Sequence, residues 1–192
     1  MITEILIPGW EVLESHLGSA RRSIFISSPW ITKNGLDVVL SVLEKRTRDS
    51  LDFIRIWSRL SPLDDLLGMS DSLSLLEFLE FCKSHFSLQP EISVNDHLHA
   101  KFYLIDNQKV LLGSSNLTGG GFDSNVEILC LLDDEKCILQ VKDIINRYQA
   151  SMLPVSREAL GSYCDRVISL KERYAKGRIT IEDIKKQTFN GH

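Results

Sequence analysis

Two hydrophobic periods alternate along this chain, and together they predict a fold that mixes helices with strands. Helices are predicted where apolar residues recur every three to four positions, over residues 10–20, 36–43, 73–86, 138–148 and 160–174. Short apolar runs between the first helices predict buried strands, at residues 22–31, 51–57 and 91–94. This alternation is typical of α/β architecture.

Three more strands follow in the middle of the chain, with no room for helices between them. They are predicted at residues 100–106, 109–113 and 126–132. Asp106, Asn107 and Gln108 separate the first two, which are therefore expected to form an antiparallel hairpin. The sheet is expected to be mixed. Residues 153–192 are expected to form a C-terminal helical extension to a domain over residues 1–152.

Length and composition support one compact domain. The 192 residues are 43% hydrophobic, enough for a core that buries most of the apolar surface. No stretch approaches about 18 uninterrupted apolar residues and no basic leader precedes an apolar run, so we expect a soluble, cytoplasmic protein without a membrane partner. The four cysteines lie far apart without metal-ligand spacing, so no metal site is expected.

The balance of charge limits how this protein could hold a nucleic acid. The net charge is −4, so the chain lacks the global positive charge that drives nonspecific binding to phosphate backbones. A nucleic acid would have to be held by local clusters, of which Arg55 with Arg59 is one. Any single cluster is most simply interpreted as a solvated face.

Polar residues interrupt the strand pattern at HLHAKFYLID, residues 97–106. Side chains alternate along a strand, so His99, Lys101 and Tyr103 are expected to share one face. His99 and Lys101 would pack poorly together on a buried face. The lysine cation disfavours the imidazolium form of the histidine, and burying an unpaired lysine costs free energy. An anion between them would explain the pattern: Lys101 would hold a phosphate oxygen while neutral His99 attacks phosphorus.

The residues that follow make this interpretation specific. Gly113, Ser114 and Asn116 come after Asp106, completing the pattern H-x-K-x4-D-x6-G-S-x-N, and Glu127 lies eleven residues beyond Asn116. Six residue types at fixed separations carry far more information than a short glycine motif. The pattern closely resembles the HKD signature of the phospholipase D superfamily, and the resemblance covers roughly residues 1–150.

The resemblance implies a fold and an assembly. Members of the superfamily have a mixed β-sheet flanked by helices on both faces, and two HKD motifs meet across a two-fold axis to form one active site. This chain has one motif, so it is similar to the single-motif members that pair as homodimers. The nearest layouts are those of small bacterial endonucleases and of the catalytic domains of metal-independent restriction enzymes.

The resemblance also implies roles for individual residues. His99 would be the nucleophile that forms a phosphohistidine, while the partner subunit's His99 would protonate the leaving oxygen and later activate water. Lys101 and Asn116 would bind the non-bridging phosphate oxygens, with Ser114 as a further hydrogen-bond donor. Glu127 would accept the imidazole N–H and fix its tautomer. Oriented donors of this kind stabilise a transferring phosphoryl group without a metal or another cofactor.

Some nearby residues are left with a structural interpretation or with two. Asp106 lies at the far end of the predicted strand from Lys101, so we expect it to fix local structure. His97 is outside the signature and is expected at the rim. Trp30 could stack on a base of the substrate or pack in the core. The glycines at 119–121 could approach a phosphate or form a flexible turn.

The sequence therefore predicts a metal-independent phosphodiesterase, a nuclease that acts as a homodimer on nucleic acid, with DNA expected before RNA. One alternative is a phospholipase or phosphatidyltransferase, which would need an apolar channel or a membrane-docking patch. Another is a noncatalytic DNA-binding subunit of a defence or restriction complex. Residues 153–192 could pack on the sheet domain, extend a dimer interface or dock a partner, and the sequence does not choose.

Overall fold

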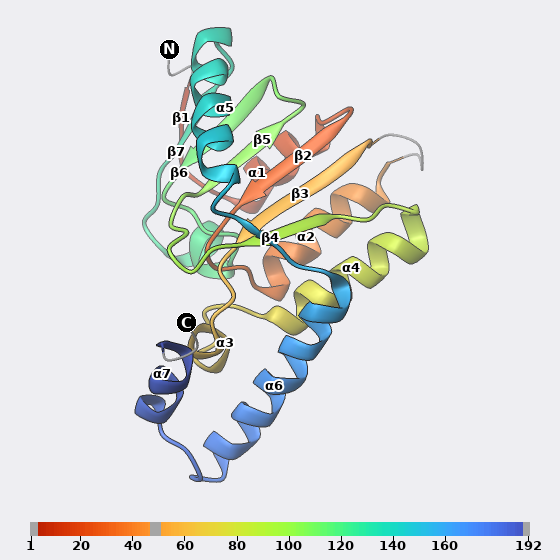
Figure 1. Ribbon diagram of the computed structural model, residues 1–192. Coiled ribbons are helices and arrows are strands. Elements are labelled where there is room, and N and C mark those ends of the chain that lie inside the picture. The colour runs from red at the N-terminus through yellow and green to blue at the C-terminus, as the bar shows by residue number, and fades with distance from the viewer. Residues whose placement is uncertain (1–3, 47–50, 190–192) are drawn as a thin grey trace.

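A single mixed sheet organises the computed structural model, which describes residues 4–46 and 51–189 (Figure 1). Its strand order is β1-β7-β6-β5-β2-β3-β4-β8. The strands are β1 (Glu4–Leu6), β2 (Ser23–Ser27), β3 (Phe53–Ser58), β4 (Glu91–Val94), β5 (Phe102–Ile105), β6 (Lys109–Gly113), β7 (Leu129–Leu132) and β8 (Leu153–Pro154). Strands β2, β3 and β4 run parallel, and the other pairings are antiparallel. The predicted α/β fold with a mixed sheet is confirmed.

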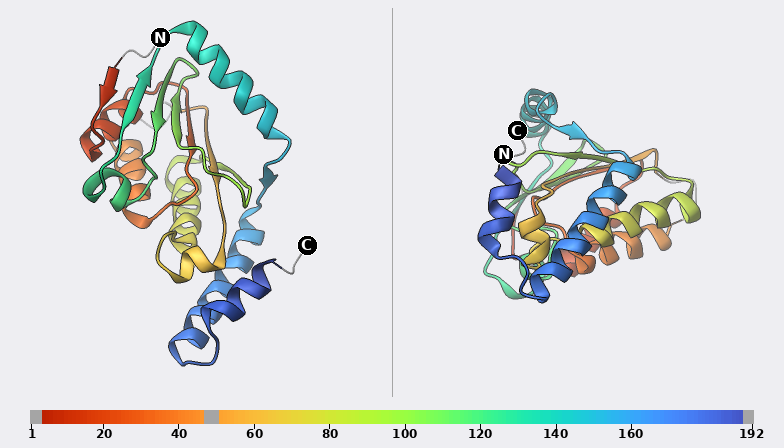
Figure 2. Two further views of the ribbon diagram at one scale, coloured as in Figure 1. Left: turned by 90° about the vertical axis from the view of Figure 1, so that its left-hand side faces the viewer. Right: turned by 60° about the horizontal axis from the view of Figure 1, so that its bottom comes forward.

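Helices cover both faces of this sheet, as expected. The helices are α1 (Trp10–Gly18), α2 (Lys33–Glu44), α3 (Pro62–Leu66), α4 (Ser72–Phe86), α5 (Glu135–Gln149), α6 (Arg157–Ala175) and α7 (Ile181–Phe189), with one π-helical turn, η1 (Gly120–Ser124). Figure 2 shows α1, α2 and α4 on one side of the sheet and α5 on the other. No helix in the described ranges is long and apolar enough to cross a membrane.

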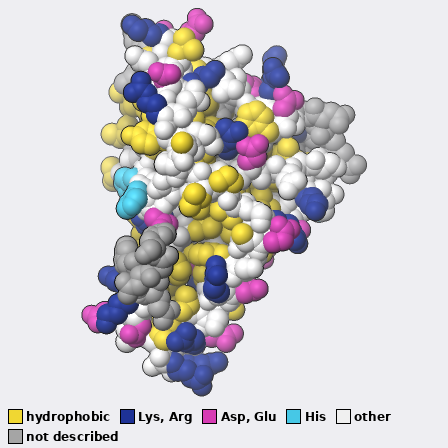
Figure 3. Space-filling model, viewed as in Figure 1, with side chains coloured by type: hydrophobic (Ala, Val, Ile, Leu, Met, Phe, Trp, Pro, Cys, Tyr) yellow, Lys and Arg dark blue, Asp and Glu magenta, His cyan; other side chains and the backbone are white. Residues whose placement is uncertain are grey.

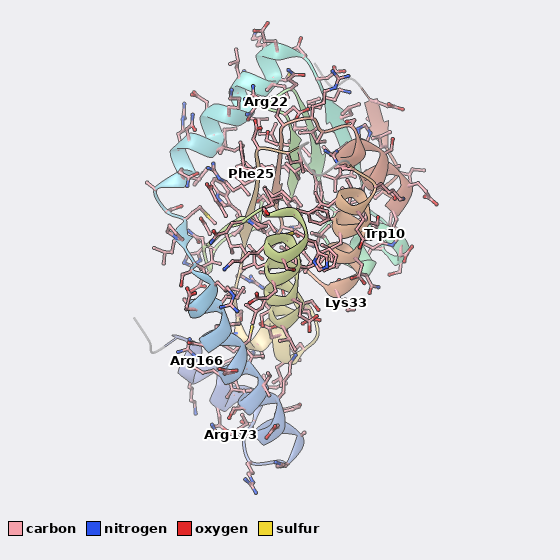
Figure 4. The ribbon with its side chains drawn as sticks, turned by 90° about the vertical axis from the view of Figure 1, so that its right-hand side faces the viewer. Trp10, Arg22, Phe25, Lys33, Arg166 and Arg173 are labelled. Carbon is pink, nitrogen blue, oxygen red and sulfur yellow. The ribbon has the colours of Figure 1, made fainter. Side chains whose placement is uncertain are left out.

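Two hydrophobic clusters fill the spaces between these layers. Along β5, Tyr103 and Ile105 belong to the larger cluster under α1, α2 and α4, whereas Phe102 and Leu104 belong to the smaller one under α5. Phe25 of β2 also lies between the sheet and α5 (Figure 4). The central strands are thus buried on both faces, which explains why their sequences are nearly continuous apolar runs.

The structure corrects several strand boundaries. Two strands predicted at residues 100–106 and 126–132 are shorter, since β5 begins at Phe102 and β7 at Leu129. The ladder between β2 and β5 ends at Ser27 paired with Phe102, because β2 turns away there at Ser28 and Pro29. Strands β1 and β8 were not predicted, because two or three exposed residues carry no period.

The hairpin between β5 and β6 is confirmed. The two strands pair antiparallel from Phe102 with Leu112 to Ile105 with Lys109. Asp106 and Asn107 both have positive φ, 54° and 57°, in the turn between them. Both residue types tolerate this conformation, and two such residues match the twist of a short hairpin.

The C-terminal segment packs on the sheet domain. Leu160 and Cys164 of α6 belong to the larger hydrophobic cluster, and α6 contacts α4 and α3. The hydroxyl of Tyr163 donates to Asp65 Oδ2 at 2.9 Å, which ties α6 to α3. Farther along α6, Arg166 and Arg173 mark the part that extends beyond the sheet (Figure 4). Helix α7 in turn contacts α3, and the boundary at residue 152 stays a prediction.

Candidate active site

One edge of the sheet gathers the side chains of interest. The parallel strands β2 and β3 both end there, and β5, which runs antiparallel to β2, begins there. Trp30 therefore follows β2, Arg59 follows β3 and Lys101 precedes β5 at the same edge. Ligands of open α/β sheets bind outside the carboxyl ends of parallel strands.

His99 and Lys101 are in direct contact at this edge. The Lys101 Nζ lies 3.2 Å from His99 Nε2 and donates to the His99 carbonyl oxygen at 2.9 Å. An ammonium group can only donate, so Nε2 accepts and the proton of a neutral imidazole sits on Nδ1. His99 is exposed while Lys101 is only 7% exposed. The pair exists as expected, but in the segment before β5 rather than within a strand.

The environment of Lys101 makes its charge less stable than that of an exposed lysine. Burial lowers the pKa of Lys101, the Glu127 carboxylate raises it, and the Arg59 guanidinium lowers it. The net pKa is below the ordinary value of 10.5. In the described part of the chain Lys101 has no ion pair with a carboxylate, so an added anion would relieve both the desolvation and the repulsion from Arg59.

Asn116 is held at the same edge by the loop after β6. The Gly113 N–H donates to the Lys101 carbonyl at 3.3 Å, and the Tyr103 hydroxyl donates to the Ser115 carbonyl at 3.1 Å. Asn116 itself is 8% exposed, and its Oδ1 is buried without a hydrogen-bond partner in the described chain. This oxygen can only accept, so a donor group would satisfy it, whereas a phosphate oxygen would have to bind the amide Nδ2–H.

The glycines at 119–121 belong to the segment that packs against this loop. They lie in and just before η1, and a Cβ on Gly121 would be 2.2 Å from the carbonyl oxygen of Asn116. Only a hydrogen atom fits at that distance, so Gly121 lets η1 pack directly against the backbone of Asn116. Gly121 thus has a packing role, and whether these glycines approach a phosphate stays a prediction.

Ser114 makes two hydrogen bonds to the segment that carries Glu127. The Ser114 N–H donates to the Ile128 carbonyl at 3.1 Å, and the Ile128 N–H donates to Ser114 Oγ at 3.1 Å. Glu127, the preceding residue, accepts a hydrogen bond from Asn125 Nδ2 at 3.3 Å. No hydrogen bond joins Glu127 to His99 among the described residues. The predicted pairing of Glu127 with an imidazole therefore stays a prediction.

Trp30 forms one wall of the site. Its ring is half-buried, lies edge-on 6.3 Å from the ring of His99 and is 6.0 Å from Lys101 Nζ. Its indole N–H donates to Asp64 Oδ2 at 3.2 Å. The structure thus brings Trp30, His99 and Lys101 together. Whether Trp30 stacks on a substrate stays a prediction.

Arg59 and Asp64 complete this wall, and neither was predicted as a site residue. Arg59 was noted only as part of a basic cluster with Arg55, which instead pairs with Glu91. The sequence position of Arg59 was the signal that could have revealed it. Arg59 follows the apolar run of β3, just as Trp30 follows the apolar run of β2. Side chains at such strand ends converge in parallel sheets.

Asp106 is separate from this chemistry, as expected. Its carboxylate accepts the backbone N–H groups of Arg21 and Arg22 at 2.7 Å and of Ser23 at 2.9 Å, at the other end of β2. Burial raises the pKa of Asp106, but these N–H groups outweigh it, so the pKa lies below the ordinary value of 3.8. Its structural role is confirmed.

A cavity of about 460 Å³ opens beside His99, between α5 and the segment before β5. Apolar side chains make up most of its lining, including Trp57, Phe102, Ile145 and Met152. It could receive an apolar part of a substrate bound at His99.

Comparison with known proteins shows a likeness over part of the chain. Residues 63–149, from α3 to the end of α5, match the family model described as cardiolipin synthase, PLD-like domain. These residues are thus similar to a phospholipase D-like domain. A curated relative, cardiolipin synthase 1 of Staphylococcus aureus (strain COL), is 24% identical over 166 residues, covering 80% of this chain. The chain spans only 29% of the length of that relative.

Solved structures show the same phospholipase D-like fold. NucT from Helicobacter pylori has a TM-score of 0.57 and 18% identity, over 79% of this chain and 98% of that one. Nuc from Salmonella typhimurium, a phospholipase D family member, has a TM-score of 0.58 and 13% identity, over 79% and 97%. Phosphatidylserine synthase from Haemophilus influenzae Rd KW20 has a TM-score of 0.65 and 16% identity, over 96% and 46%. The resemblance expected from the sequence is confirmed at the level of the superfamily.

Proposed function

We propose that this phospholipase D-like protein is a metal-independent phosphodiesterase that cleaves nucleic acid through a phosphohistidine on His99. The contact of the exposed His99 Nε2 with the buried Lys101 Nζ, at 3.2 Å, carries the proposal. It places a nucleophile, whose lone pair accepts from Lys101, beside a cation that lacks a carboxylate ion-pair partner in the described chain. A phosphodiester supplies the anion and the electrophile that this pair lacks.

The proposed reaction has two steps. The lone pair of His99 Nε2 attacks phosphorus, the bond from phosphorus to the leaving oxygen breaks, and that oxygen takes a proton from the partner subunit's His99. A water molecule then attacks the same phosphorus, loses a proton to the partner subunit's His99, and breaks the phosphorus–nitrogen bond. Lys101 and Asn116 bind the non-bridging oxygens in both steps, with Ser114 as a further donor.

Binding of substrate and exposure of the nucleophile are coupled in this scheme. In the free site the Lys101 ammonium donates to the lone pair that must attack. A phosphate oxygen is a stronger acceptor than neutral imidazole, so substrate draws Lys101 away and frees Nε2. In this scheme Glu127 accepts a hydrogen bond from the Nδ1–H of an imidazole and so preserves the reactive tautomer.

We propose that the second histidine comes from a second copy of this chain, in a homodimer. Exposed apolar side chains gather along the β1–β7–β6 edge and the segment before β7, next to Glu127: Ile5, Ile7, Leu112, Val126 and Ile128. Hydrophobic side chains are visible along this edge, on the left-hand side of Figure 3. A self-complementary contact of this surface would place two sites side by side.

We infer nucleic acid as the substrate, with DNA before RNA, from the likeness to NucT and Nuc. This chain matches almost all of NucT and Nuc, but less than half of the phosphatidylserine synthase and under a third of the cardiolipin synthase. Its motif and its layout resemble those expected of the small nuclease-like members. Trp30 beside two cations also suits a base and its phosphates.

One observation favours a second candidate, a phospholipase or phosphatidyltransferase. The apolar cavity of about 460 Å³ beside His99 could hold a lipid chain. The same cavity is wide enough for a nucleobase, so it does not decide between the two. The experiment must therefore offer both substrate classes.

Labelled DNA, RNA and phosphatidylglycerol vesicles are incubated with the protein in excess EDTA. We expect cleavage of DNA that persists in EDTA, disappears in His99→Ala and survives in His97→Ala, the neighbouring exposed histidine outside the signature. Rapid acid-free quenching should trap a phosphate that is stable in base and labile in acid, as phosphohistidine is. Cleavage of the vesicles alone would establish the second candidate, and activity in His99→Ala would contradict both.

A further inference from the structure

Arg59 stands beside the reactive pair in a fixed orientation. Its Nε and Nη2 both donate to Asp64 Oδ2, at 2.8 and 2.6 Å, and its guanidinium lies over the ring of Trp30 with Cζ 5.4 Å from the ring centre. The side chain is only 24% exposed. A fork held by two hydrogen bonds and a ring has little rotamer entropy left to lose on binding.

The fold sets the position of Asp64, which in turn holds the Arg59 guanidinium. It is buried on α3, and the same Oδ2 also accepts the indole N–H of Trp30. The next residue, Asp65, caps Ser72 at the start of α4 and accepts from Tyr163 of α6. Arg59 is therefore held by a buried carboxylate of α3, and the next residue, Asp65, ties α3 to α4 and α6.

A purely structural ion pair between β3 and α3 would not account for two further features of Arg59. Its Nη1 makes no hydrogen bond in the described part of the chain, and the guanidinium shares the ring of Trp30 with the Lys101 ammonium. Two cations beside one half-buried ring repel each other, and Arg59 indeed lowers the pKa of Lys101. Such an arrangement is stabilised when anions bind both.

We propose that Arg59 binds the phosphate adjacent to the scissile phosphate of a polynucleotide strand, with Asp64 and Trp30 as its positioning residues. The inference rests on the proposed function and specifies its substrate class. Lys101 would hold the reacting phosphate and Arg59 its neighbour, with the ring of Trp30 between them for a base. A polynucleotide offers both phosphates at once, whereas a simple diester offers one.

Binding of a single-stranded DNA oligonucleotide tests the contact directly. In a His99→Ala background, Arg59→Gln should weaken binding at least about tenfold, because a charge-assisted contact is lost. The slope of log affinity against log salt should fall by about 0.7, the value for one phosphate on a single strand. Arg55→Gln, four residues earlier on β3, is the matched control and should change affinity less than about twofold. Equal effects of the two variants would overturn the inference.

Cleavage separates this subsite from the chemistry. The kcat/KM of Arg59→Gln on the oligonucleotide, divided by that on bis(4-nitrophenyl) phosphate, should fall at least about tenfold relative to the parent. Arg59→Lys should restore part of the ratio, which guards against misfolding of the first variant. An equal loss on both substrates would refute a role for Arg59 at a second phosphate while leaving the proposed nuclease intact. Parent protein that cleaves the small diester but no polynucleotide would refute the proposed nuclease itself.

Discussion

The ammonium of Lys101 lies 3.2 Å from Nε2 of His99, the atom that is proposed to attack phosphorus. The lysine is buried, and the histidine is exposed and faces solvent. In the free protein the Lys101 ammonium donates to the lone pair of His99 Nε2. When a phosphate binds, it competes for the ammonium, and the lone pair becomes available for attack. The predictions below follow from this pair and from the structures that support it.

Removing the charge of Lys101 should abolish most activity while leaving the nucleophile in place. In Lys101→Met the phosphate loses its main electrostatic partner, and kcat should fall about 10²–10³-fold, as it does when a transition-state donor is removed. Steady-state cleavage of DNA in EDTA measures this. Activity within about threefold of the parent would contradict the assigned role.

The pH profile should move in opposite directions when the two charges near Lys101 are removed. The proton of Lys101 is lost below pH 10.5, so activity should fall on the alkaline side of the profile. Arg59 lowers this pKa, so Arg59→Gln should move the alkaline limb to higher pH. Glu127 raises it, so Glu127→Gln should move the limb of its residual activity to lower pH. An alkaline limb that stays at the same pH in both variants would show that ionisation of Lys101 does not set it.

Asp106 should contribute to stability and not to catalysis. Its folded-state pKa lies below 3.8, so its contribution is fully present above the unfolded pKa and is lost as pH falls through the folded value. Asp106→Asn should lower the free energy of unfolding by about 1–3 kcal/mol at pH 7, with a smaller difference in acid. Urea unfolding at several pH values measures this.

An exposed carboxylate provides the control for Asp106. Asp52 pairs with Arg22 in solvent, and Asp52→Asn should cost less than about 1 kcal/mol. The folded Asp106→Asn protein should keep the kcat of the parent. A kcat lowered at unchanged stability would place Asp106 in the reaction after all.

Gly121 should be essential for the position of Asn116. A Cβ there would lie 2.2 Å from the carbonyl oxygen of Asn116, so Gly121→Ala must displace the loop, with a loss of about 1–3 kcal/mol in stability and a lower kcat. The matched control is Gly161 in α6, where an added Cβ meets nothing within 4 Å. Gly161→Ala should instead raise stability by about 0.5–1 kcal/mol, because alanine favours a helix. Calorimetry and DNA cleavage test the pair.

The proposed dimer should depend on the apolar edge beside Glu127. Ile128 is exposed, and its backbone rather than its side chain bonds to Ser114. Ile128→Asp should therefore leave the fold intact but produce a monomer without activity, since each site would lack the second histidine. Sedimentation at micromolar concentration detects this. Ile168→Asp on α6, also exposed, should stay dimeric and active. An active monomer would refute the shared site.

The sequence by itself determined the fold class and predicted the residues of the candidate site. Alternating periods predicted a mixed α/β sheet, because burial on one or both faces imposes local patterns that survive in one dimension. Fixed spacings placed His99 and Lys101 before Gly113, Ser114 and Asn116, and the expected hairpin turn at Asp106 was confirmed. These features are local, so they can be read without knowing the fold.

Only the tertiary structure decided which distant residues share the site. Arg59 and Asp64 lie 40 and 35 residues before His99 in the sequence, and they reach it because β3 runs parallel to β2 while β5 runs antiparallel. The tertiary structure also decided that Lys101 precedes its strand, where β2 turns away and leaves the ammonium beside Trp30. Pairing direction and packing are long-range properties, and no local period encodes them.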